Sequence, residues 1–105
     1  MRFWTSPEFD DHEQICLFSD RETVLRAIVA IHSTALGTAV GGTRFRCYGD
    51  DGLALDDALR LSRAMSYKSA LAGLPCGGGK SVIMGDPDRM KTKPLLHAYG
   101  RFINR

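Results

Sequence analysis

The chain has 105 residues, of which 44% are hydrophobic and 25% are charged, and its formal net charge is +2. This size and balance are typical of one ordinary globular domain. The small and dispersed charge gives no reason to expect a nucleic-acid partner. No stretch approaches the roughly 20 apolar residues of a membrane span, so we expect no membrane partner either.

The cysteines indicate the redox environment. Cys16, Cys47 and Cys76 are odd in number and widely spaced, and they form no Cys-x-x-Cys pair. The three histidines do not stand at metal-ligand spacing from them. The N-terminus carries acidic residues early and lacks the apolar core of a signal peptide. We therefore expect a reduced, cytoplasmic protein without a metal site, whose cysteines are small core residues.

Three strands are predicted in the first half of the chain. Residues 13–19 combine β-branched and aromatic side chains and end at a turn-prone Ser-Asp pair. The apolar run 24–31 is short and rich in Val and Ile, which favours a strand buried on both faces over a helix. Residues 39–48 alternate between polar and apolar positions. The pair Gly41-Gly42 interrupts this last strand and indicates a bulge or a close approach to the backbone.

A helix is the clearest element that follows. Residues 50–52 are turn and capping residues, and Gly73 is a suitable stop after a helix that runs to about 68–72. Its apolar stripe, at the spacing of an amphipathic helix, consists of Leu55, Ala58, Leu59, Ser62 and Met65. A short strand over 81–84 and a last helix over 93–104 come next. Strands followed by alternating helix and strand predict an α/β domain.

The stretch 71–83, LAGLPCGGGKSVI, looks at first like a phosphate-binding loop. The motif G-x-x-x-x-G-K-[ST] requires a glycine at position 74, and Leu74 stands there. Pro75 removes an N–H group that would bind phosphate. The predicted order of helix, glycines and strand is also the reverse of a phosphate loop. We therefore reject a nucleotide-phosphate role and expect the glycines to allow a sharp turn with open space around Lys80.

Two lysines in this region are candidates for chemistry. Between residues 64 and 85, only Lys68 and Lys80 are expected to be charged at pH 7. If both point into one cleft, desolvation and mutual repulsion lower their pKa values. A lysine of lowered pKa can act as a general base near neutral pH, and one that stays charged can bind a carboxylate. Alternatively, both side chains reach solvent from otherwise buried elements, and the residues alone leave the two readings open.

The motifs around these lysines carry a resemblance to a known family. The chain resembles the N-terminal domain of the Glu/Leu/Phe/Val amino-acid dehydrogenases, especially the leucine, valine and phenylalanine branch. The matching segments are GGTRF (41–45), the stretch 56–87 with SYKSA and GGGKS, and AYGRF (98–102), with weaker similarity over 27–40. The resemblance implies an α/β fold with a mixed, mostly parallel sheet packed with helices. It also implies a homo-oligomer.

The resemblance further implies an activity and a set of site residues. The activity is NAD-dependent, reversible oxidative deamination of an aliphatic or aromatic L-amino acid to a 2-oxo acid and ammonia. By motif, Lys80 of GGGKS is the catalytic lysine, and Lys68 of SYKSA binds the substrate carboxylate. The other substrate-binding residues that the resemblance implies are Val40, Gly41, Gly42 and Met65.

The resemblance also shows what these 105 residues do not contain. The family's catalytic aspartate falls just beyond Arg105, and no G-x-G-x-x-G motif of a dinucleotide-binding fold occurs. We therefore expect one domain over 1–105, truncated relative to the family, for substrate binding and oligomerisation. It would hold half of an active site, bind no cofactor and be inactive alone, while the full-length enzyme binds NAD. The alternative is a non-catalytic module derived from that family, which oligomerises or binds a small acid.

The N-terminal aromatic residues admit two interpretations. Phe3, Trp4 and Phe9 precede the first predicted strand. They either form a contact with another subunit or cap the core of the domain.

Overall fold

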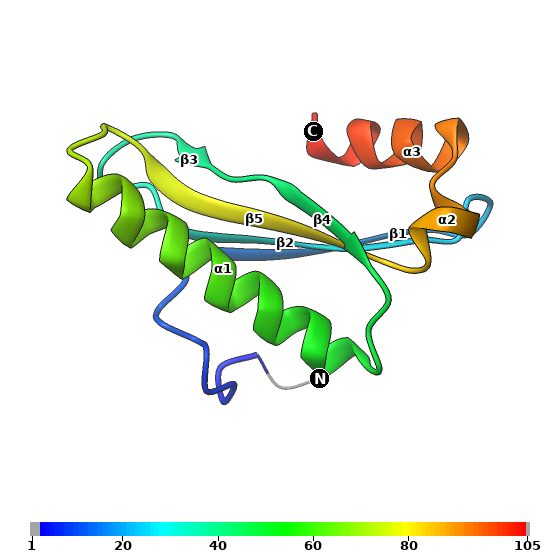
Figure 1. The fold of residues 1–105 in the computed structure, drawn as a ribbon, viewed down its shortest axis with the longest axis horizontal. Coiled ribbons are helices and arrows are strands. Elements are labelled where there is room, and N and C mark those ends of the chain that lie inside the picture. Colours follow the sequence, from blue (N-terminus) through cyan, green and yellow to red (C-terminus); the bar gives the residue numbers. More distant parts are fainter. Residues whose placement is uncertain (1–2, 105) are drawn as a thin grey trace.

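The computed structural model describes residues 3–104 and contains a five-stranded sheet with helices on both faces (Figure 1). The strands are β1 (Gln14–Asp20), β2 (Leu25–Ser33), β3 (Ala39–Val40), β4 (Thr43–Arg46) and β5 (Gly77–Met84). The helices are α1 (Asp51–Leu71), α2 (Pro87–Met90) and α3 (Lys93–Ile103). The predicted α/β class is confirmed, and α2 is an element that the sequence reasoning did not predict.

The order of strands across the sheet is β1, β2, β5, and then β3 and β4 along the outer side of β5. β1 pairs antiparallel with β2, and β2 pairs antiparallel with β5, whereas β3 and β4 run parallel to β5. The sheet is mixed as expected, but the expectation that it is mostly parallel is corrected. A short turn joins β1 to β2 and can only produce antiparallel strands, while the crossover through α1 makes β4 and β5 parallel.

The central strands β2 and β5 separate two apolar clusters. Val82 of β5 packs with Ile28 and Ala30 of β2 against α1. The next residue of β5, Ile83, belongs instead to the cluster that contains Leu95 of α3. This alternation follows from the two-residue period of a strand, and it buries β2 and β5 on both faces.

Helix α1 begins and ends where the sequence predicts. The carboxylate of Asp50 accepts a hydrogen bond from the backbone N–H of Leu53, at 3.0 Å, and so caps the first turn. Gly73 follows the last turn with φ of +72°, a left-handed conformation that favours glycine. The predicted apolar stripe faces the sheet, where Leu55 and Leu59 are completely buried.

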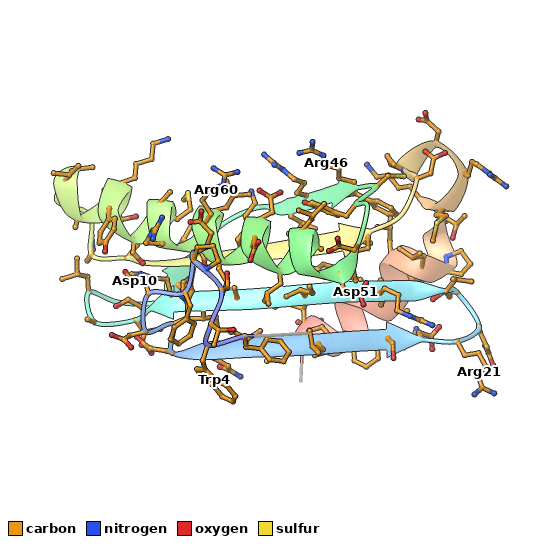
Figure 2. The ribbon with its side chains drawn as sticks, turned by 90° about the horizontal axis from the view of Figure 1, so that it is seen from below. Trp4, Asp10, Arg21, Arg46, Asp51 and Arg60 are labelled. Carbon is orange, nitrogen blue, oxygen red and sulfur yellow. The ribbon has the colours of Figure 1, made fainter. Side chains whose placement is uncertain are left out.

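The N-terminal aromatic residues divide between the core and the surface. Phe3 and Phe9 pack against the core beside α1, whereas Trp4 is 79% exposed and projects from the surface (Figure 2).

All three cysteines are free thiols, but none is a core residue. Cys47 is exposed because it follows the last residue of β4, and the expectation of buried cysteines is therefore wrong. No helix within 3–104 is long and apolar enough to cross a membrane.

The segment before β1 is tied to α1 by a buried histidine. Nδ1 of His12 accepts the backbone N–H of Asp10, so the ring proton is on Nε2, which donates to the carbonyl of Leu59 at 2.8 Å. The carboxylate of Asp10 in turn accepts hydrogen bonds from Tyr67 of α1 and His32 of β2. Burial lowers the pKa of His12, although the hydrogen bond to Leu59 opposes this effect.

This environment predicts how stability depends on pH. The unfolded chain takes up a proton on His12 near pH 6.5, while the folded chain resists it. The free energy of unfolding should therefore fall as the pH drops from 7.5 to 5.5. In His12→Gln the fall should be smaller, whereas in the control His97→Gln, at an exposed position of α3, it should match the parent chain. Urea unfolding at several pH values measures this, and an unchanged slope in His12→Gln contradicts the assignment.

Candidate active site

Lys80 lies in the middle of β5 and faces α1. It stands opposite Ala30 of β2, which belongs to the cluster under that helix. Its side chain is half-buried and extends to the β4 edge of the sheet. There its Nζ lies 3.5 Å from the point that a Cβ on Gly42 would occupy. The ammonium group of Lys80 therefore sits over the backbone that leads into β4.

One side of α1 faces the same edge of the sheet. Arg44 of β4 donates a hydrogen bond to Asp57 of α1 at 2.9 Å, which fixes this side of the helix toward β4. Met65 and Lys68 follow two and three helical turns later, on that side. Met65, closer to the sheet, is half-buried, and Lys68 is exposed.

The connection from β3 to β4 completes this edge. Val40 pairs with Gly78 of β5 and is half exposed, and Gly41 and Gly42 continue from it along β5. The structure thus places every site residue that the sequence predicts along one edge, between α1 and the β3–β4 connection: Val40, Gly41, Gly42, Met65, Lys68 and Lys80. That the two ammonium groups act on a single ligand stays a prediction.

The charges at this edge are unbalanced. The four ion pairs among residues 3–104 use His32, Arg44, Arg60 and Arg63 as their basic members. Neither Lys68 nor Lys80 pairs with a carboxylate of the described part of the chain. Because a half-buried ammonium group without a counter-charge is costly, this edge is suited to bind a small anion such as a carboxylate. No group of three or more His, Cys, Asp or Glu within the same residues is arranged to hold a metal ion.

The three glycines before Lys80 have a different role from the one expected. They form the start of β5 itself, not a turn, and a Cβ on Gly78 would lie 2.3 Å from the carbonyl oxygen of Ser62 and from the backbone nitrogen of Ser66. A Cβ on Gly41 would lie 1.5 Å from the carbonyl oxygen of Gly79. The expectation of a sharp turn is therefore wrong, because these glycines continue the strand and lie against the backbone of α1 and of the β3–β4 connection.

A buried acidic residue beside the site escaped the sequence reasoning. Asp57 has a side chain only 10% exposed, and its carboxylate accepts hydrogen bonds from Arg44, Tyr48 and Arg60. Burial raises the pKa of Asp57, but the hydrogen bonds from Tyr48 and Arg60 and the charge of Arg44 outweigh it, so the pKa lies below its ordinary value. Burial, together with the hydrogen bond to Asp57, raises the pKa of Tyr48 to about 12. An acid at the border of an apolar helical stripe is the signal that could have revealed this cluster.

The sequence and the fold match one class of proteins. Residues 12–105 match the family described as Glu/Leu/Phe/Val dehydrogenase, dimerisation domain, and the chain belongs to this family. The resemblance seen in the sequence motifs is thereby confirmed.

Individual relatives are amino-acid dehydrogenases. Over 92 residues the chain is 58% identical to valine dehydrogenase of Streptomyces albus, covering 88% of this chain and 25% of that protein. It is 50% identical over 103 residues to leucine dehydrogenase of Geobacillus stearothermophilus, covering 98% of this chain and 28% of that protein. The crystal structure of L-tryptophan dehydrogenase from Nostoc punctiforme matches with a TM-score of 0.83 and 52% identity, over 87% of this chain and 27% of that chain. The chain therefore spans about a quarter of the length of these relatives.

The neighbouring residues Gly41 and Gly42 give a matched test of the packing. Gly41→Ala should lower the free energy of unfolding by at least about 2 kcal/mol, because its Cβ would overlap a backbone oxygen of β5. Gly42→Ala should cost much less, because its Cβ meets only the flexible end of Lys80 at 3.5 Å. Urea unfolding of both variants measures the difference, and equal costs would show that the backbones are not in contact.

Proposed function

We propose that this chain is the substrate-binding and oligomerisation domain of an L-amino-acid dehydrogenase. Residues 1–105 form one domain of a longer cytoplasmic, homo-oligomeric enzyme. That enzyme reversibly deaminates an aliphatic or aromatic L-amino acid to a 2-oxo acid and ammonia with NAD. The observation that carries the proposal is the pair Lys68 and Lys80 at one edge of the sheet, without carboxylate partners within 3–104. The identity to valine and leucine dehydrogenases supports it.

The chemistry assigned to this chain begins with the substrate carboxylate. Lys68 is exposed and charged, and it binds the carboxylate by charge-assisted hydrogen bonds. The adjacent backbone of Gly42 presents no side chain, so the substrate can lie against it beside Lys80. Val40 and Met65 supply apolar surface for the amino-acid side chain at the same edge. Fixing the carboxylate orients Cα and so contributes to the rate by positioning.

Lys80 then handles the proton of water. Once the amino acid has been oxidised to an imino acid, a water molecule attacks the imine carbon and loses a proton. In its neutral form, Lys80 accepts this proton, and its position on a central strand keeps its Nζ over Gly42. In the reverse direction the ammonium group of Lys80 returns the proton.

The residues described do not fit NAD. The dinucleotide-binding motif places glycines between a strand and a helix, whereas Gly77, Gly78 and Gly79 lie inside β5 and follow α1. The helix that follows β5 is α2, which has four residues. We therefore assign NAD binding to the rest of the enzyme. The chain alone is inactive in this proposal.

The experiment that tests the proposal is an activity assay on the full-length protein. With NAD and branched-chain or aromatic L-amino acids it should produce NADH, while the 105-residue chain should produce none. A full-length protein that binds small acids and oligomerises without turnover would instead support a non-catalytic module.

The two lysines should differ in their kinetic effects. Lys80→Ala should lower kcat by at least about 100-fold, because a general acid–base group is lost. Lys68→Ala should mainly raise KM for the amino acid, by roughly 10-fold or more, because a charged hydrogen bond to the carboxylate is lost. Lys91→Ala, at an exposed lysine after α2, is the control and should behave as wild type. A kcat for Lys80→Ala within a few-fold of wild type would show that the role is wrongly assigned.

A further inference from the structure

The carboxylate of Asp57 links α1 to the sheet beside the proposed site. Arg44 of β4 donates to Oδ2 at 2.9 Å, and Arg60 of α1 itself donates to Oδ1 at 2.7 Å. The hydroxyl of Tyr48, in the loop after β4, donates to Oδ2 as well. Arg44 and Tyr48 therefore cross from the β4 side to the helix, while Arg60 joins two positions of the same helix. In Figure 2, Arg60 of α1 and Arg46 of β4 both project at the β4 edge of the sheet.

Burial makes this link stronger than a surface ion pair. The side chain of Asp57 is 10% exposed, that of Arg44 35% and that of Arg60 49%. Removal of a partner from a buried carboxylate leaves a charge that water cannot fully solvate, so the remaining groups move to recover contacts. Exposed Arg60 can be replaced by water at little cost. Arg44 is less exposed and comes from β4, so its loss removes the charged group that joins this carboxylate to the sheet.

The hydrogen bond between Arg44 and Asp57 lies on the same side of the sheet and of α1 as the proposed substrate site. Arg44 follows Gly42 by two residues in an extended segment, so both lie on the α1 side of the sheet, where Nζ of Lys80 also lies. Asp57 precedes Lys68 by three helical turns on the same side of α1. The link at Asp57 therefore helps to set how α1 is turned toward β4, and with it the direction in which Lys68 projects along that edge. Between Asp57 and Lys68, the contact of Gly78 with the backbone of Ser62 and Ser66 fixes how closely α1 approaches β5.

We propose that Arg44 is a positioning residue for substrate: its bond to Asp57 holds α1 against β4 and thereby fixes Lys68 opposite Gly42 and Lys80. The inference rests on the proposed function. It assigns to the arginine of the GGTR motif a role that requires no contact with the substrate. Tyr48 assists by binding the same carboxylate oxygen.

The test compares two arginines that bind the same carboxylate. In the full-length dehydrogenase, Arg44→Met keeps the aliphatic stem and removes the donor. It should raise KM for the amino acid by about 10-fold or more, as expected when a charged contact is misplaced. KM for NAD should stay within 2-fold of wild type. Arg60→Ala removes the other charged partner and should leave both KM values within 2-fold. Arg44→Lys restores a cation and should recover most of the affinity.

Two further measurements keep the outcome decisive. Kinetics are measured well below the melting temperature of each variant, so a merely structural role would lower that temperature without changing KM. If Arg44→Met does not fold, Tyr48→Phe removes the other cross-link without a charge change, and it should raise KM for the amino acid a few-fold. Equal effects of Arg44→Met and Arg60→Ala, or an unchanged KM in every folded variant, overturn the inference. Absence of turnover in the wild-type protein overturns the proposed function itself.

Discussion

The architecture depends on one contact between two backbones. At Gly78, β5 approaches α1 so closely that no side chain fits between the strand and the helix at Ser62 and Ser66. This contact determines how deeply the long helix lies on the sheet and which of its sides face outward. One side then meets the N-terminal segment through His12, and the other meets β4 through Asp57. The proposed site occupies the second side.

The distribution of charge follows from the same geometry. On the side of α1 that faces the N-terminal segment of the chain, the carboxylates have hydrogen-bond donors. Glu8 pairs with Arg63, and Asp10 accepts hydrogen bonds from Tyr67 and His32. On the β4 side, Asp57 is satisfied by arginines and a tyrosine, and beyond it the described residues supply two lysines without an acidic partner. A half-buried lysine without a carboxylate partner, near a second such lysine, suits this edge to an anionic ligand. An amino acid or a 2-oxo acid carries such a group.

The sequence predicted most elements because their local signals agree with their tertiary environment. Asp50 and Gly73 delimit α1, and the interrupted pattern over 39–48 became two short strands separated by Gly41-Gly42. The sequence-based predictions failed for features that depend on packing between the sheet and distant parts of the chain. The glycines before Lys80 indicate a turn when only the local sequence is considered. The structure instead requires a glycine at Gly78 because the backbone of α1 lies directly on it. The direction of the strands, the exposure of Cys47 and the cluster around Asp57 likewise depend on contacts between distant segments, which no local pattern reports.

We propose that Lys68 and Lys80 form one site for an amino acid. A crystal structure of the full-length protein with a branched-chain 2-oxo acid tests it most directly. We expect Nζ of Lys68 to lie within about 3 Å of the ligand carboxylate, and Nζ of Lys80 to lie at the same distance from the 2-oxo group. The ligand should rest against Gly42. A ligand bound away from this edge, or one whose carboxylate is held without either lysine, would show that the two lysines do not form one site.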